Sequence, residues 1–145
     1  MNLPIHHIGY LVKKGQKAQA SFLALGYHTV QDWVRDDARG IDISFLEKDS
    51  ITIELVSPFR EDSSVSGLMK RIKNSPYHIC YVSESLEKDA SALRAEGYLP
   101  ITEPAPAPAC GGHPVQFFLH PAVGMIELVE GTFPWQGNAI ALTQT

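Results

Sequence analysis

Three short segments of the chain occur twice, in the same order and at nearly the same interval. The segment H-H-I-G-Y-L-V returns as Y-H-I-C-Y-V, a helix-like stretch ends in G-Y in both places, and I-T-I-E-L-V returns as G-M-I-E-L-V. The matched residues are His7 with His78, Gly26 with Gly97, and Glu54 with Glu127. Each match alone is weak, but the shared order and the nearly constant interval indicate a tandem duplication, which constrains the whole fold.

Each copy is predicted to contain one strand, one helix and three further strands. In the first copy, β-rich stretches cover 5–12, 27–34, 41–46 and 51–56, and apolar residues at helical spacing cover 15–25. In the second copy, the strands are expected at 77–82, 98–101, 115–119 and 125–129, and the helix at 86–96. Residues 103–114 hold four prolines and two glycines, which predict an extended or turning loop, long enough for a lid.

The predicted fold class is α+β, with tandem βαβββ modules that form a cup-shaped mixed sheet. The modules are expected at about residues 4–58 and 76–131, with a linking helix in 59–75 and a tail at 132–145. A chain of 145 residues fits a single domain that buries about two thirds of its unfolded surface.

The alternation of side chains along a strand predicts where the matched residues point. In 51–56 the odd-numbered residues form an apolar face, and Glu54 points away from that face. His7 is expected to point away from the helix in the same way, so duplication brings two histidines and two glutamates into the cup. Singly, each is more typical of a hydrogen-bonded or solvated residue. Together, His7, Glu54, His78 and Glu127 predict one divalent metal ion, octahedral Mn, Fe, Co, Ni or Zn, with two open positions.

The other histidines and the two cysteines lack such support. Surface or loop positions are expected for the remaining histidines, His6, His28, His113 and His120. Cys80 lies two residues beyond His78 and is expected to look into the same cavity, where it fills space or lines the site. Cys110 and His113 make only half of a zinc motif, and both cysteines are expected to stay thiols.

Composition argues against several classes of protein. The sequence has no apolar run long enough to span a bilayer and no basic segment followed by an apolar one, so neither a membrane partner nor secretion is expected. A formal charge of -4 leaves no basic footprint for nucleic acid. A cytoplasmic protein with a small-molecule substrate is expected.

These features resemble the vicinal oxygen chelate superfamily and, within it, the methylmalonyl-CoA epimerases. Two longer blocks carry the resemblance: E-L-V-S-P-F-R-E-D-S-S-V-S-G-L-M-K-R-I-K from Glu54, and G-G-H-P-V-Q-F-F-L-H-P from Gly111. The resemblance implies paired βαβββ modules around a metal site, with ligands at His7, Glu54, His78 and Glu127. It also implies a homodimer, to which Phe133 and Trp135 of the tail could contribute.

The resemblance further implies proton abstraction α to a carbonyl, most simply of an acyl-CoA thioester. The expected bases are Glu54, Glu127 and Asp42. Asp42 in G-I-D-I-S-F is expected to face the cup as a base, with a solvated position near the turn as the alternative. Tyr77 stands where these epimerases commonly have a histidine, which leaves the substrate open. Substrate contacts are expected from Tyr77, Cys80, Lys70 and Arg71, and Lys73 joins the last two as a candidate for the phosphates of CoA.

Three alternatives remain open from the sequence. A glyoxalase I type isomerase, acting on a glutathione adduct, has Glu in the position of Glu54, but the S-P-F-R-E-D block and the absence of a basic cluster argue against it. An Fe(II) dioxygenase needs two histidines and one carboxylate, which leaves one glutamate superfluous. A non-catalytic ligand-binding or resistance protein often lacks the full ligand set, so the complete set here favours catalysis.

Overall fold

The computed structural model describes residues 1–132. The expected contribution of Phe133 and Trp135 to a dimer lies outside the described residues. Within residues 1–132, no helix combines the length and the apolar character that crossing a bilayer requires.

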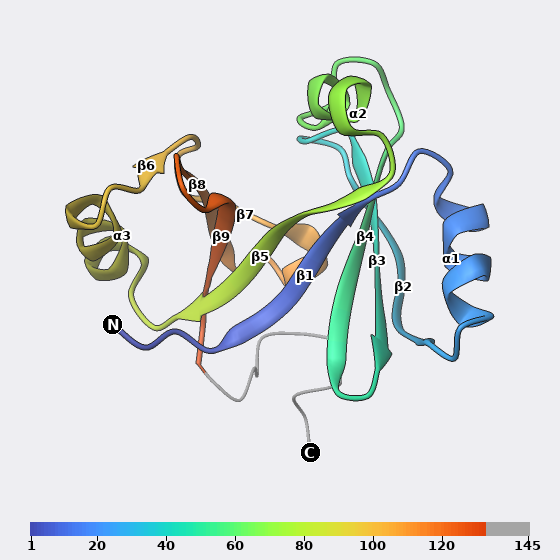
Figure 1. The fold of residues 1–145 in the computed structure, drawn as a ribbon, viewed down its shortest axis with the longest axis horizontal. Coiled ribbons are helices and arrows are strands. Elements are labelled where there is room, and N and C mark those ends of the chain that lie inside the picture. Colours follow the sequence, from blue (N-terminus) through green and yellow to red (C-terminus); the bar gives the residue numbers. More distant parts are fainter. Residues whose placement is uncertain (133–145) are drawn as a thin grey trace.

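Nine strands of the described chain form one mixed sheet, in the order β2-β3-β4-β1-β5-β9-β8-β6, with β7 paired to β8 (Figure 1). The strands are β1 Ile5–Leu11, β2 His28–Asp36, β3 Ile41–Lys48, β4 Ile51–Pro58, β5 Ser75–Ser83, β6 Leu99–Pro100, β7 Ala105–Pro106, β8 Pro114–His120 and β9 Gly124–Glu130. The α-helices are α1 Gly15–Leu23, α2 Ser66–Ile72 and α3 Leu86–Ala95. The predicted α+β class with a mixed sheet is confirmed.

The topology repeats in the two parts of the chain. Strand β1 is parallel to β4 in the first part, as β5 is parallel to β9 in the second. The two parts are joined where β1 and β5 pair in antiparallel orientation. Figure 1 shows α1 and α3 on the outside at opposite ends of the sheet, with the inner faces of the strands turned toward each other. The curled sheet therefore has one inner face, shared by both parts.

Three apolar clusters explain this shape. On the outside, α1 covers Ile53 and Leu55 of β4, and α3 covers Phe118 and Leu128. The third cluster lies inside the cup and includes Phe45 and Val129. Because Ile53 and Leu55 pack under α1, the alternating residues of β4 point inward, as predicted for Glu54.

The proline-rich segment forms part of the inner wall instead of a lid. It contains β7 and a 3-10 turn at Pro108–Cys110, in which Ala109 and Cys110 are buried. The Gln31 side-chain amide donates a hydrogen bond of 2.9 Å to the carbonyl of Ala109. Arg39 likewise donates to the carbonyl of Pro106, at 2.9 Å. These bonds satisfy backbone groups of the segment, which permits its burial.

Candidate metal centre

The four residues matched by the repeat meet inside the cup. Their ligand atoms all lie within 4.8 Å of one another, and no more than 5% of any of the four residues is exposed. The Nε2 atoms of His7 and His78 are 3.2 Å apart. Oε1 of Glu127 lies 3.3 Å from Nε2 of His7 and 3.0 Å from Nε2 of His78. Oε1 of Glu54 lies 3.3 Å and 3.6 Å from the same two nitrogens.

The pairing of four neighbouring strands creates this convergence. Gly9 of β1 pairs with Glu54 on one side and with His78 on the other. Cys80 of β5 pairs with His7 on one side and with Glu127 on the other. A side chain at Gly9 would overlap the His78 imidazole, because a Cβ built there meets the ring atoms of His78. Gly9 therefore provides the space that one of the histidines occupies.

Burial gives the centre unusual electrostatics. Desolvation alone would lower the pKa of His7, but the charge of Glu54 and hydrogen bonds with Glu127 and Glu54 outweigh it and raise this pKa to about 10. Desolvation would raise the pKa of Glu127, whereas its hydrogen bonds to His7 and His78 and their charges bring it well below the usual range. The carboxylate is thus charged, and a proton on His7 compensates part of its charge.

The donor set fits a divalent cation. Nitrogen and oxygen ligands lie about 2.0–2.2 Å from such an ion, so two ligands at right angles stand about 3 Å apart. The distances of 3.0 to 3.6 Å between the imidazole and carboxylate atoms match this spacing. Oε1 of Glu127 is also buried, with the two imidazoles as its ion-pair partners. A buried carboxylate needs a positive charge beside it, which a proton on an imidazole or a metal ion can supply.

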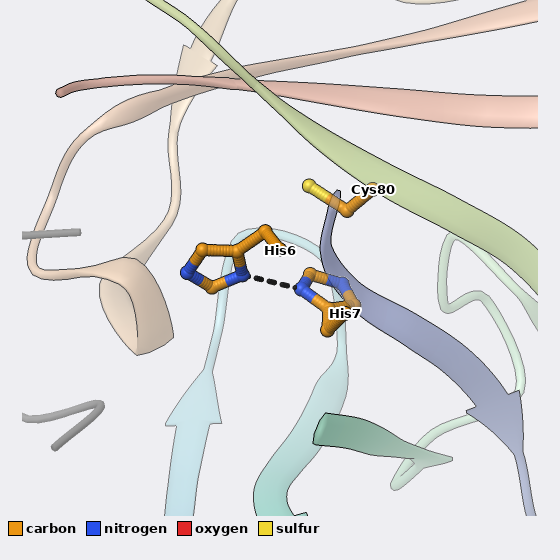
Figure 2. Close-up of side chains that lie close together, drawn as sticks. All are labelled: His6, His7 and Cys80. Carbon is orange, nitrogen blue, oxygen red and sulfur yellow. Dashed lines mark hydrogen bonds between the residues drawn. The ribbon is translucent and has the colours of Figure 1, made fainter. Parts of the chain in front are cut away.

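Each of the two histidines of the centre follows a residue that a bulge turns inward. The pairing of β1 with β5 shifts register between Ile5 and His7, and again between Gly9 and Tyr10, where Tyr77 is the extra residue. His6 and Tyr77 therefore depart from strict alternation. The expected surface position of His6 is wrong: only 4% of it is exposed, and its Nδ1 lies 2.8 Å from Nδ1 of His7 (Figure 2).

One phenylalanine from each part of the chain lies against an imidazole of the centre. Phe45 pairs with Glu54, and its ring is edge-on to that of His7, with centroids 5.3 Å apart. Phe117 pairs with Glu127, and its ring is edge-on to that of His78, also at 5.3 Å. These contacts restrict the imidazoles, and the sequence interpretation did not single them out. Each phenylalanine is adjacent to a glutamate of the centre across a strand pair. This adjacency could have identified them, but it becomes visible only once the pairing register of the strands is known.

A cavity of about 380 Å³ leads to the centre. It is bordered by Tyr77 and Phe117, which also line a smaller space that reaches Glu54 and Glu127. Of the predicted substrate contacts, Tyr77 and Arg71 line this cavity, whereas Lys70 does not. Cys80 is fully buried behind His7, and its burial raises the pKa of its thiol, so it fills space.

Asp42 does not face the cup, and this expectation is wrong. Its neighbours Ile41 and Ile43 belong to the apolar cluster inside the cup, so Asp42 points to the opposite face. There its carboxylate accepts hydrogen bonds of 2.9 Å and 3.0 Å from Arg35, beside Trp33 near the start of α1. In the described part of the cup, β3 contributes only apolar side chains next to the ligands.

The remaining histidines lie away from the centre. His28 is largely exposed beside Glu47, and His120 lies against the ring of Tyr98. His113 shares a hydrogen bond of 2.9 Å with the carbonyl of Glu130. Cys110 is a free, buried thiol, as is Cys80. Cys110 and His113 are not among the described groups that could hold a metal ion.

Comparison with known structures identifies the fold. A hypothetical protein from Bacillus halodurans superimposes with a TM-score of 0.79 at 23% identity, over 91% of this chain and 96% of that one. Methylmalonyl-CoA epimerase from Streptomyces coelicolor, in complex with 2-nitronate-propionyl-CoA, gives 0.74 at 21%, over 89% and 98%. The Mycobacterium tuberculosis epimerase gives 0.74 at 21%, over 89% and 88%.

Sequence comparison gives the family. No curated protein matches the chain. The sequence model of the glyoxalase/bleomycin resistance protein/dioxygenase superfamily matches residues 6–117, which is most of the chain. That span contains His7, Glu54 and His78, whereas Glu127 lies beyond it. The chain belongs to the glyoxalase/bleomycin resistance protein/dioxygenase superfamily, the vicinal oxygen chelate proteins.

Proposed function

We propose that this protein is a divalent-metal-dependent isomerase that removes a proton α to a carbonyl, with an acyl-CoA thioester as its substrate class. The observation that carries the proposal is the buried set of two imidazoles and two carboxylates at the end of an open cavity. A purely structural site would be closed by protein ligands, whereas a catalytic one keeps a way in. His7, Glu54, His78 and Glu127 would hold the ion.

The bound ion would supply a Lewis acid for the negative charge that develops on the carbonyl oxygen when the proton leaves. The chain itself must supply the proton acceptor. Glu54 and Glu127 are the carboxylates near the inner end of the cavity, apart from Asp36, which is held by Arg39 at 2.8 Å. Glu54 and Glu127 come from opposite parts of the chain. We assign them as base and acid on the two faces of the α carbon.

The cavity suits a substrate with an apolar part and an anionic part. Ile41, Val65 and Leu68 give it apolar walls, which exclude water from the carbanionic intermediate. Arg71, in the last turn of α2, provides a cation at the same cavity. An acyl group inside the cavity would match its apolar walls, and phosphates near Arg71 would match its positive charge. The epimerases with the same fold support the acyl-CoA class, because one was solved with an acyl-CoA analogue and another with methylmalonyl-CoA.

The test is proton NMR in D₂O with methylmalonyl-CoA and the metal-free protein reloaded with Co²⁺. We expect the α-proton signal to disappear with cobalt and to persist with the chelated protein. Glu54→Gln and Glu127→Gln should each slow the exchange by about 10²–10⁴-fold, because a positioned acid or base contributes that much. Glu61→Gln, an exposed acid outside the cavity, is the matched control. Persistence of the signal with every divalent metal would refute the acyl-CoA proposal.

A glyoxalase I type isomerase is a second candidate, favoured by one observation. Both metal-facing carboxylates are glutamates, and β3 presents only Ile41, Ile43 and Phe45 to the cup, so the ligands themselves must handle the proton. This reaction begins with the same proton abstraction from a thiohemiacetal of glutathione. Formation of S-lactoylglutathione in the absence of α-proton exchange on acyl-CoA would select it. Metal binding without either reaction would indicate a ligand-binding protein.

A further inference from the structure

His6 contacts one of the proposed ligands from behind. Its Nδ1 lies 2.8 Å from Nδ1 of His7, while Nε2 of His7 faces the carboxylates at 3.3 Å. Figure 2 shows the two rings joined by this hydrogen bond, with Cys80 close by. The ring planes are nearly perpendicular, at 78°. The two nitrogens of His7 therefore have different partners, one toward the centre and one toward His6.

The direction of this hydrogen bond follows from the chemistry of imidazole. A histidine that binds a metal through Nε2 needs a lone pair there, so its proton is on Nδ1. Two Nδ1 atoms can share a hydrogen bond only if one carries a proton and the other does not. His7 is then the donor and His6 the acceptor, and His6 carries its own proton on Nε2.

We propose that His6 is a positioning residue of the metal centre, which accepts the Nδ1 proton of His7 and so fixes the tautomer and the orientation of that ligand. The inference rests on the proposed metal site. Metal-ligating histidines usually give their second N–H to a carboxylate, a backbone carbonyl or water. Here a second imidazole, the adjacent residue in the sequence, takes that place.

The local fold holds His6 in this role. The bulge before His7 leaves His6 outside the regular pairing with β5, so both rings turn into the cup. The ring of Phe45 is edge-on to both, with centroids 6.2 Å from His6 and 5.3 Å from His7. Burial then limits other rotamers. A second ion among His6, His7 and Cys80 is disfavoured, because it would require His7 to lose its Nδ1 proton and bridge two metals.

The role can be tested in the native protein by nitrogen-15 NMR of the histidine rings after zinc loading. We expect His7 to carry its proton on Nδ1 and to bind zinc through Nε2, and His6 to carry its proton on Nε2. A zinc-loaded His7 protonated at Nε2, or a His6 protonated at Nδ1, would overturn the proposal. This measurement needs no variant and so does not depend on how well variants fold.

Variants supply a second readout, the zinc affinity measured by competition with a chromophoric chelator. His6→Leu removes the acceptor and should weaken zinc binding by about 10–100-fold, the usual effect of losing such a partner. His6→Asn keeps an acceptor oxygen near the position of Nδ1 and should restore most of this affinity. His28→Leu, at an exposed histidine, is the matched control and should bind zinc like the native protein.

The outcomes separate this inference from the function on which it rests. If the native protein fails to bind zinc, cobalt and nickel, the metal centre itself is refuted, and the positioning role with it. If the native protein binds zinc and His6→Leu binds it equally tightly, only the role of His6 is refuted. The same holds if His6→Asn is as weak as His6→Leu, because shape and not hydrogen bonding would then be responsible.

Discussion

The two repeats build matching parts of one centre, yet they surround their histidines differently. In both, a bulge turns the preceding residue inward and a phenylalanine ring lies 5.3 Å from the imidazole. In the first repeat that preceding residue, His6, hydrogen-bonds Nδ1 of His7. In the second repeat Tyr77 packs edge-on against His78 at 4.5 Å, and Nδ1 of His78 has no hydrogen-bond partner among the described residues.

The difference extends to the cavity. Phe45 and His6 are buried, whereas their counterparts Phe117 and Tyr77 border the space through which a substrate would enter. The duplicated scaffold thus gives His7 a buried hydrogen-bonding neighbour, His6, and gives His78 a neighbour, Tyr77, that borders the cavity. We expect the neighbours of His7 to influence the metal affinity more strongly, and the neighbours of His78 to determine which substrate groups reach the metal.

The largest expected effect comes from Gly9, which faces His78. Gly9→Ala would place a methyl group on the His78 imidazole and displace that ligand, so the zinc affinity should fall by about 100-fold or more. Gly67→Ala is the matched control, because a Cβ there meets nothing within 4 Å. Chelator competition measures both. Native affinity in Gly9→Ala would mean that His78 is not held against Gly9.

The pH dependence tests the first repeat. With its pKa raised to about 10 by Glu54 and Glu127, His7 carries an extra proton at neutral pH, and a metal ion must displace it. Competition from this proton weakens as pH rises toward that pKa. The Ni²⁺ affinity should therefore increase about tenfold per pH unit between pH 6.5 and 8.5. Calorimetry measures it. An affinity independent of pH over this range would show that His7 is not protonated in the metal-free protein.

Tyr77 provides a direct contrast with His6. Because Nδ1 of His78 receives no hydrogen bond from the Tyr77 hydroxyl, Tyr77→Phe should change the zinc affinity by less than about twofold, in contrast to the larger loss expected for His6→Leu. Since Tyr77 borders the cavity, the KM of the Tyr77→Phe protein for its substrate can still change. A zinc affinity that falls as much in Tyr77→Phe as in His6→Leu would contradict the asymmetry.

The smallest effect is expected at Asp42. Its carboxylate binds Arg35 on the outer face of β3, so Asp42→Asn should leave the zinc affinity and the α-proton exchange rate within about twofold of native values. The exchange assay in D₂O measures the rate. A loss of 10²-fold, the size expected for a catalytic base, would place Asp42 in the reaction after all.

The repeat predicted more than composition could. It gave the order of strands and helices and the inward face of β4, and the ligand atoms of His7, Glu54, His78 and Glu127 meet as expected. The prediction from the repeat failed where a backbone irregularity or long-range packing determines the position of a side chain. A bulge is not visible in a pattern of period two, so His6 was expected at the surface.

The prediction for Asp42 was wrong for a different reason. Asp42 was expected to face the cup, but the cup is itself apolar around the centre, and Ile43 packs inside it beside Val56. The proline-rich segment was expected to be a loop, and its burial depends on hydrogen bonds from Gln31 and Arg39, far away in the sequence. Pairing register and distant partners cannot be read from a local pattern.

The central claim is that two imidazoles and two carboxylates, one of each from each repeat, bind one ion. X-ray absorption spectroscopy of the zinc-loaded protein, with the metal content measured on the same sample, tests it most directly. We predict one zinc per chain, a shell of nitrogen and oxygen only, and the scattering signature of two imidazoles. A sulfur neighbour at about 2.3 Å, which would implicate Cys80 or Cys110, or a single imidazole in the shell, would contradict the account.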